Sequence, residues 1–187
     1  MDSLELSEPH IIAMVGIPGA GKTYFASQFS DTFGAPYLDQ ELFGMVFSAR
    51  TESAGFAIIS RILFEVMKTR QTIVYEGPLD KRVYRTNLND FAKRSGYKVL
   101  FVWVQTDEAI ARTRWRKSNS ADNQIYDKLI SDFSSPHASE HQIIISGRHT
   151  YNTQVKTILK YLSSKKTNPA ERKSVLGRSP SRSSNTK

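Results

Sequence analysis

The chain contains no cysteine among its 187 residues, so it can form no disulfide, no thiolate metal site and no cysteine nucleophile. No stretch reaches the roughly 20 apolar residues that a membrane-spanning helix requires. Residues 1–8 are acidic and lack a long apolar run, which is unlike a secretory signal peptide. These absences predict a cytoplasmic protein, and the length is most simply that of one folded domain.

The positive charge of the chain is concentrated at its C-terminal end. The net charge of the whole chain is +8. Residues 165–187 contain seven Lys or Arg residues and one Glu, so they account for six of these eight positive charges. The same residues are rich in Ser, Pro and Arg and poor in apolar side chains, which predicts a disordered tail. We therefore expect a folded domain over residues 1–164 and a solvated tail over 165–187. A nucleic-acid-binding arm is the alternative interpretation of the tail.

One short motif carries most of the chemical information. Residues 16–23 read Gly-Ile-Pro-Gly-Ala-Gly-Lys-Thr and fit the phosphate-binding pattern G-x-x-x-x-G-K-[ST]. An apolar run at 11–15 precedes the motif and a helix-compatible segment at 24–29 follows it, which is the strand–loop–helix context that such a loop requires. The motif predicts ATP, or another nucleoside triphosphate, together with Mg²⁺ as ligands.

Each residue type in this loop has a chemical reason to be there. The glycines can adopt positive φ and let backbone N–H groups close around phosphate oxygens. The Lys22 ammonium is expected to reach the β- and γ-phosphates, and the Thr23 hydroxyl to bind Mg²⁺. The residues expected to contact the nucleotide are Gly16, Pro18, Gly19, Ala20, Gly21, Lys22, Thr23 and Tyr24.

Strand-like and helix-like segments alternate along the rest of the chain. The expected strands are 11–15, 35–38, 72–75, 98–104 and 142–145, and the expected helices are 24–29, 40–47, 55–68, 80–94, 107–116, 124–133 and 153–162. Asp80 is expected to cap the helix at 80–94, and Gly96 to lie just past its end. The pattern predicts an α/β three-layer P-loop NTPase fold, with a five-stranded parallel sheet and helices on both faces. The ligand should lie at the carboxyl ends of the strands.

Missing motifs narrow the class of P-loop protein. The chain has no Asn-Lys-x-Asp guanine-binding motif, and the strand at 72–75 ends in Glu76-Gly77-Pro78 rather than the Asp-Glu pair of a motor. The pair Asp107-Glu108 is interpreted as a helix cap. Among the classes of P-loop protein, small kinases of the nucleoside-monophosphate-kinase type remain. Glu76 lies at the end of a buried strand and is the expected acidic partner of Mg²⁺.

The chain resembles the small P-loop kinases that group with the polynucleotide 5′-hydroxyl kinase domain and the zeta-toxin kinases, often labelled AAA_33. The resemblance spans residues 10–162. It is carried by the loop at 16–23, by Leu38-Asp39-Gln40-Glu41-Leu42-Phe43, by Tyr75-Glu76-Gly77-Pro78 through Arg85, and by the lid segment 109–116 with arginines four residues apart.

The resemblance implies a nucleoside-kinase-like fold with a helical lid, which transfers the γ-phosphoryl group of ATP to a hydroxyl of a small molecule or of a nucleic-acid 5′-end. It implies that Glu41 is the catalytic base, with Asp39 as the rival. It also implies that Arg112 and Arg116 join Lys22 in stabilising charge, while Arg114 and Lys117 are interpreted as solvated. It places Arg85 near the nucleotide or the acceptor.

Three positions depart from the pattern of this group. Glu41 and Glu76 stand where the group usually has Asp, and Gly44 stands where it usually has Arg. These departures motivate two alternative functions. One is an ATP-binding regulatory or toxin–antitoxin-like protein with weak or no phosphoryl transfer, and the other is a nucleic-acid-binding protein that uses the basic tail.

Overall fold

Five parallel strands form the centre of the fold, as predicted. The structure, a computed structural model, describes residues 8–46, 52–118 and 123–164, so the predicted tail lies outside it. The strands are β1 (His10–Val15), β2 (Tyr37–Asp39), β3 (Ile73–Glu76), β4 (Lys98–Gln105) and β5 (Gln142–Ser146). Their order across the sheet is β2-β3-β1-β4-β5, and every neighbouring pair is parallel. The carboxyl ends of all five therefore meet at one edge.

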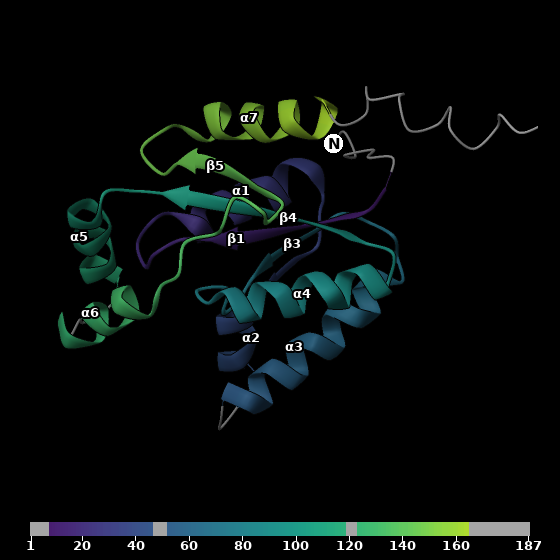
Figure 1. Cartoon of the computed structure of the whole chain (residues 1–187), viewed down its shortest axis with the longest axis horizontal. Helices are drawn as coiled ribbons and strands as arrows, with labels where there is room; N and C mark the ends of the chain where they lie inside the picture. The colour runs from purple at the N-terminus through teal and green to yellow at the C-terminus, as the bar shows by residue number, and fades with distance from the viewer. Residues whose placement is uncertain (1–7, 47–51, 119–122, 165–187) are drawn as a thin grey trace, which may run out of the picture.

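Seven helices are described, and they cover both faces of the sheet. They are α1 (Lys22–Phe33), α2 (Gln40–Val46), α3 (Glu52–Met67), α4 (Arg82–Arg94), α5 (Glu108–Ser118), α6 (Asn123–Asp132) and α7 (Tyr151–Ser164). Helices α1 and α7 lie on one face, and α3 and α4 lie on the other (Figure 1). Helices α5 and α6 lie beyond the carboxyl ends of the strands, where β4 runs toward α5 (Figure 1).

The strands are apolar throughout because both faces of the sheet are covered. In β1, Ile11, Ala13 and Val15 pack in the core on the α3 and α4 side, whereas Ile12 and Met14 pack in the core against α1 and α7. All five side chains are at most 1% exposed. This alternation fixes the register of the central strand, since a shift by one residue would exchange the two faces.

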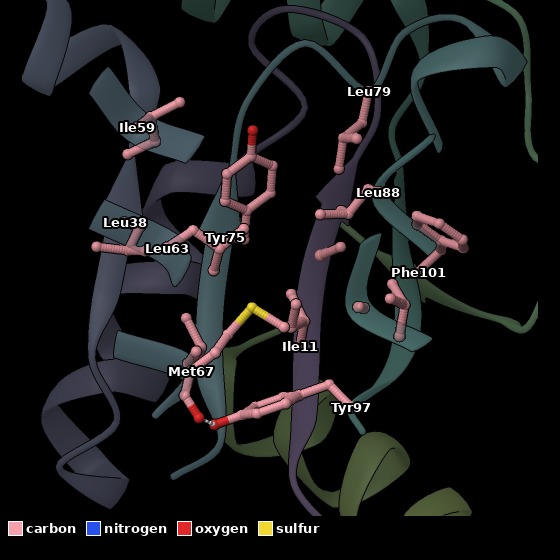
Figure 2. Packing of buried hydrophobic residues seen from close by; sticks show 14 of the residues in the cluster. Ile11, Leu38, Ile59, Leu63, Met67, Tyr75, Leu79, Leu88, Tyr97 and Phe101 are labelled. Carbon is pink, nitrogen blue, oxygen red and sulfur yellow. Dashed lines mark hydrogen bonds between the residues drawn. The ribbon is translucent and has the colours of Figure 1, made fainter. Parts of the chain in front are cut away.

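A buried tyrosine fixes the end of α3 against the start of β4. Figure 2 shows the Tyr97 ring in the core beside Met67 and Ile11. The Tyr97 hydroxyl donates to the carbonyl of Met67 at 3.0 Å and lies 2.9 Å from the carbonyl of Gln71. These carbonyls belong to the end of α3 and the turn that follows it, so the bonds anchor that end of the helix at the edge of the sheet opposite the phosphate-binding loop.

Most predicted elements are confirmed to within a few residues, but one cap is wrong. Helix α4 begins at Arg82 after Lys81, and no side chain caps it, so Asp80 is not its cap. The backbone at Asp80 is instead held in a turn, because its carbonyl accepts the Ser134 N–H at 2.8 Å. The predicted cap at Asp107 is confirmed, since its Oδ1 accepts the N–H of Ala109 at 3.0 Å. No helix in the described part of the chain is long and apolar enough to cross a membrane.

Candidate nucleotide-binding site

The glycine-rich loop leads from β1 into α1 at the carboxyl edge of the sheet. Gly16, Gly19 and Gly21 all have positive φ, as predicted. At Gly21, with φ +103°, this conformation sets the start of α1 at Lys22. The first N–H groups of a helix have no partners within that helix, and the helix dipole adds partial positive charge there. The loop therefore presents backbone donors to an anion at the N-terminus of α1.

Lys22 lies within the loop and is held by it. Its ammonium group donates to the carbonyl of Gly16 at 2.9 Å and to that of Ile17 at 3.2 Å. Burial lowers the pKa of Lys22, and the negative charges of Glu76 and Glu41 oppose this shift. A bound triphosphate would add negative charge at the same place and favour the charged ammonium form.

Thr23 and Glu76 meet at the end of the loop. The Thr23 hydroxyl donates to Oε1 of Glu76 at 3.0 Å. Burial raises the pKa of Glu76, whereas the charge of Lys22 and the hydrogen bond from Tyr37 act in the opposite direction. A hydroxyl and a carboxylate beside a phosphate-binding loop are hard oxygen ligands of the kind that Mg²⁺ takes together with substrate phosphates. No group of three His, Cys, Asp or Glu side chains gathers in the described ranges to hold a metal by itself. The residues present therefore fit an Mg²⁺ ion that is shared with a nucleotide.

The two candidate bases have different surroundings. Asp39 ends β2, and its Oδ1 accepts the N–H of Glu41 at 2.9 Å and that of Leu42 at 3.2 Å. Asp39 therefore caps α2, while its Oδ2 lies 3.3 Å from the Tyr37 hydroxyl. Glu41 lies in the first turn of α2 and its side chain is exposed. The structure thus uses Oδ1 of Asp39 as the cap of α2, places its Oδ2 near the Tyr37 hydroxyl, and leaves the Glu41 side chain accessible.

Helix α5 packs directly on the loop at Gly19. A Cβ atom built on Gly19 would overlap the carbonyl oxygen of Ala111 and would lie 3.1 Å from the backbone nitrogen of Trp115. Thr106, just before α5, donates its hydroxyl to the carbonyl of Ala20 at 2.9 Å. The loop and the first turns of α5 are therefore in direct backbone contact, and only glycine fits at position 19.

Arg114, which the sequence analysis interpreted as solvated, is exposed and also lies beside the loop. Its guanidinium nitrogen would lie 3.9 Å from a Cβ atom built on Gly21 and donates to the carbonyl of Gly147 at 3.1 Å. Successive helical residues are about 100° apart. The loop contacts the backbone of Ala111 and Trp115, and measured from the middle of that pair Arg112 and Arg114 are each about 80° away, on opposite sides, and Arg116 about 120°. Arg114 is on the side of Gly21 and Gly147, and the sequence does not reveal the contacts that place it there.

Arg112 contacts the second lid helix in this structure. It forms ion pairs with Glu108 at 2.9 Å and with Asp127 of α6 at 2.6 Å, and its guanidinium stacks over the Tyr126 ring at 4.5 Å. Arg116 is exposed. The structure therefore pairs Arg112 with α6 rather than with the phosphate-binding loop, and of the pair expected to act together Arg112 is partly buried against α6 while Arg116 is exposed. Tyr24, also expected at the nucleotide, lies on α1 and is 60% exposed.

Arg85 is fully buried, and its contacts differ from the expected place near the nucleotide or acceptor. It pairs with Glu140 through two bonds of 2.7 and 3.1 Å. Its other hydrogen bonds go to the carbonyls of Leu79, Asp80, Ser134 and Ser135. The five N–H groups of a guanidinium are all used in these contacts. In this structure Arg85 therefore joins the start of α4 to the segment that follows α6, and it has no donor left for a ligand.

A cavity of about 500 Å³ lies beside the loop at the carboxyl ends of β4 and β5. Its apolar lining includes Ile17 of the loop, Trp103, Phe133 and Ile144, and its polar lining includes Asp107 and Arg148. The volume is within the usual range for small-molecule sites. The cavity therefore offers room for part of a bound molecule next to the phosphate-binding loop.

A five-stranded parallel sheet, a glycine-rich loop after β1 and two helices beyond the strand ends define a kinase-like P-loop NTPase fold. Solved structures with this fold include a gluconokinase from Sinorhizobium meliloti 1021, with a TM-score of 0.63 at 15% identity, over 86% of this chain and 94% of that one. A sugar kinase from Janibacter sp. HTCC2649 matches with a TM-score of 0.60 at 19% identity, over 83% and 95%. Deoxyadenosine kinase from M. mycoides matches with a TM-score of 0.55 at 14% identity, over 82% and 99%.

The sequence itself matches a family of P-loop proteins. Residues 11–128 match AAA_33, described as an AAA domain. The matched segment runs from β1 into α6 and includes the loop, Glu41, Glu76 and the lid helix α5. A comparison with curated protein sequences finds no significant match. The chain belongs to the AAA_33 family.

Proposed function

We propose that this protein is an ATP-dependent kinase that transfers the γ-phosphoryl group to a hydroxyl group of a small molecule. The observation that carries the proposal is the convergence of Lys22, the Thr23–Glu76 contact and the accessible carboxylate of Glu41 at one edge of a kinase-like fold. When bound with ATP, Mg²⁺ would supply positive charge against the phosphates. Thr23 and Glu76 are the residues that would hold it.

The proposed reaction is a single displacement at phosphorus. The acceptor oxygen bonds to the γ-phosphorus while the bond from that atom to the β–γ bridging oxygen breaks, and ADP leaves. The acceptor proton passes to the carboxylate of Glu41. We assign this role to Glu41 rather than Asp39 because Asp39 caps α2 through one oxygen and faces Tyr37 with the other.

Charge on the transferred group would be stabilised from two sides. Lys22 reaches the phosphates from within the loop, and Arg114 reaches them from α5, beside Gly21. A preorganised charge in such a place contributes about 2.7–4 kcal/mol to lowering a reaction barrier. Arg112 would contribute only after releasing Asp127, to which it is paired in this structure.

The acceptor side favours a small molecule over a nucleic-acid 5′-end. A polynucleotide channel needs basic residues along its length. Residues 44–70 follow Glu41 and would form much of the acceptor side. The described cations among them have other partners: Arg61 and Lys68 pair with Glu65, and Arg70 stacks on Tyr97. Arg50 lies outside the described residues. The gluconokinase and the sugar kinase with the same fold make a polyhydroxy compound the first acceptor to test.

The test is a transfer assay with γ-labelled ATP and Mg²⁺. The full chain is incubated with separate pools of sugars and sugar acids, nucleosides, and oligonucleotides with 5′-hydroxyl ends. Lys22→Ala is the matched blank and should lower turnover by about 10²-fold or more. Label in a small-molecule pool that disappears in the Lys22→Ala variant supports the proposal.

Three other results would contradict it. Label confined to oligonucleotide ends would replace the small acceptor by a polynucleotide. Tight ATP binding by calorimetry without label in any pool would favour an ATP-binding regulatory protein. Transfer by the Lys22→Ala variant at the wild-type rate would exclude the loop as the site of catalysis.

A further inference from the structure

Tyr37 lies between the two carboxylates at the ends of β2 and β3. Its hydroxyl donates to Oε2 of Glu76 at 2.8 Å and lies 3.3 Å from Oδ2 of Asp39. Its ring packs against the core beneath α1. A tyrosine hydroxyl has one proton, so the shorter contact marks Glu76 as its principal acceptor.

The strand geometry brings these three residues together. Residues two apart on a strand point to the same face, so Tyr37 and Asp39 share the face that carries α1. Asp39 is directly opposite Glu76, and Tyr37 is opposite Val74, two residues before Glu76. Diagonal neighbours of this kind are within reach of an aromatic side chain. The contact therefore follows from the parallel register and not from a flexible loop.

With Tyr37 in place, Glu76 is held at both oxygens. Thr23 donates to Oε1 at 3.0 Å and Tyr37 donates to Oε2 at 2.8 Å, so each oxygen has its own donor. Asp39 is fixed separately by the N–H groups of Glu41 and Leu42. Without the Tyr37 hydroxyl, the Glu76 carboxylate could rotate, and two carboxylates of like charge would face each other with no donor between them.

We propose that Tyr37 is a positioning residue for the metal site, one that fixes Glu76 so that its Oε1 faces Thr23 and a cation held there. The inference rests on the proposed function, because it concerns how the chain holds the Mg²⁺ ion of the nucleotide. Residues that orient metal-binding carboxylates by hydrogen bonds commonly change metal affinity by about 10- to 100-fold when they are replaced. Tyr37 acts through Glu76 and touches neither the phosphates nor the acceptor in this assignment.

The experiment uses Tyr37→Phe, which removes the hydroxyl and keeps the ring that packs against α1. The matched control is Tyr151→Phe, since the Tyr151 hydroxyl donates to Thr32 near the other end of α1 at 2.8 Å. Mn²⁺ replaces Mg²⁺, and its binding in the presence of a non-hydrolysable ATP analogue is measured by electron paramagnetic resonance. Binding of the analogue without metal is measured by calorimetry.

We expect Tyr37→Phe to weaken Mn²⁺ binding about 10-fold or more and to leave metal-free binding of the analogue unchanged. Tyr151→Phe should match the wild type in both measurements. In a Glu76→Gln background, Tyr37→Phe should have little further effect, because the two residues act as one unit. Thermal unfolding confirms that each variant is folded.

Two results would overturn the inference, and they are distinguishable. Equal Mn²⁺ affinity in Tyr37→Phe and the wild type, or full additivity with Glu76→Gln, would remove the role of Tyr37 and leave the proposed function standing. Failure of the wild-type chain to bind the analogue with metal would overturn both the proposed function and the role of Tyr37.

Discussion

The Thr23 hydroxyl lies 3.0 Å from Oε1 of Glu76, although 53 positions separate the two residues in the sequence. Thr23 belongs to the first turn of α1, and Glu76 ends the neighbouring strand β3. This contact joins the phosphate-binding loop to the acidic end of β3. Both residues therefore lie at the place where we propose that the Mg²⁺ ion of a nucleotide binds.

Replacing either member of this pair should weaken the use of Mg²⁺. We expect Thr23→Val and Glu76→Gln each to raise the Mg²⁺ concentration for half-maximal activity by about 10-fold or more. The double variant should lose less than the product of the two effects, because both residues serve one ion. Activity titrations with Mg²⁺ measure this, and Thr32→Val on the same helix is the control. Independent, fully multiplicative losses would contradict a shared site.

The lid arginines should differ in a way opposite to the sequence-based expectation. We expect Arg114→Ala to weaken ATP binding about 10-fold or more, as loss of a charge-assisted hydrogen bond does, because Arg114 lies beside Gly21. Arg116→Ala, on the same helix but farther round it from Gly19, should stay within about twofold of the wild type. Calorimetry with an ATP analogue measures both affinities. A larger loss at Arg116 would restore the interpretation made from the sequence.

Replacing Glu41 should lower catalysis much more than replacing Asp39. Glu41→Gln should lower kcat by about 10²-fold or more, as loss of a general base does, while ATP affinity stays unchanged. Asp39→Asn keeps a side-chain oxygen for the cap of α2 and should change kcat far less than Glu41→Gln. Steady-state kinetics and calorimetry give these values. If Asp39→Asn abolishes turnover and Glu41→Gln does not, the two assignments must be exchanged.

The buried pair Arg85–Glu140 should make stability depend on acid pH. Burial acts to raise the pKa of Glu140, but the hydrogen bonds from Arg85 and from the His137 N–H outweigh it, so the pKa lies below its ordinary value of 4.5. A carboxyl whose pKa is lowered by folding stabilises the protein above its unfolded pKa, and this stabilisation is lost as the pH falls through the folded value. The pair should therefore contribute fully at neutral pH and progressively less below about pH 4.5.

Glu140→Gln tests this dependence. It leaves the buried Arg85 charge without its partner and should cost about 3–5 kcal/mol of unfolding free energy at neutral pH. The difference between the wild type and the variant should shrink as the pH falls from about 7 to about 3. Denaturant titrations across that range measure it, and Glu65→Gln, whose partners Arg61 and Lys68 are exposed, is the control. A difference that stays constant with pH would contradict the assignment.

The predicted tail can be tested independently of the site. Deletion of residues 165–187 removes six of the eight net positive charges. We expect ATP affinity to be unchanged, because the loop, Lys22 and Arg114 all belong to the described domain. Electrophoretic binding to RNA and DNA tests the alternative role of the tail. If the full chain binds nucleic acid and the deletion variant binds it equally well, the tail is not the nucleic-acid-binding arm.

The sequence predicts the layers of this fold and the loop well, because continuous apolar strands and the glycine spacing are local signals. The N-terminal contacts of α4 and the place of Arg85 escaped prediction, since they depend on Glu140 and Ser134, about 50 positions away in the chain. The contacts of the lid arginines depend on long-range packing in the same way. Arginines four apart are visible in the sequence, but the rotation of α5 about its axis is set by Ala111 and Trp115 packing on Gly19. Long-range contacts therefore decided which residues face the site.

The backbone contact between Gly19 and α5 also limits how this domain can move. Since the first turns of α5 lie directly on the loop, they cannot swing away without deforming the phosphate cradle itself. The Arg112–Asp127 ion pair and the contact between the Trp115 and Tyr126 rings join α6 to the same helix, so α6 is linked to the loop through α5. A movement of either helix would therefore act on the glycine-rich loop through the contact between Gly19 and Ala111.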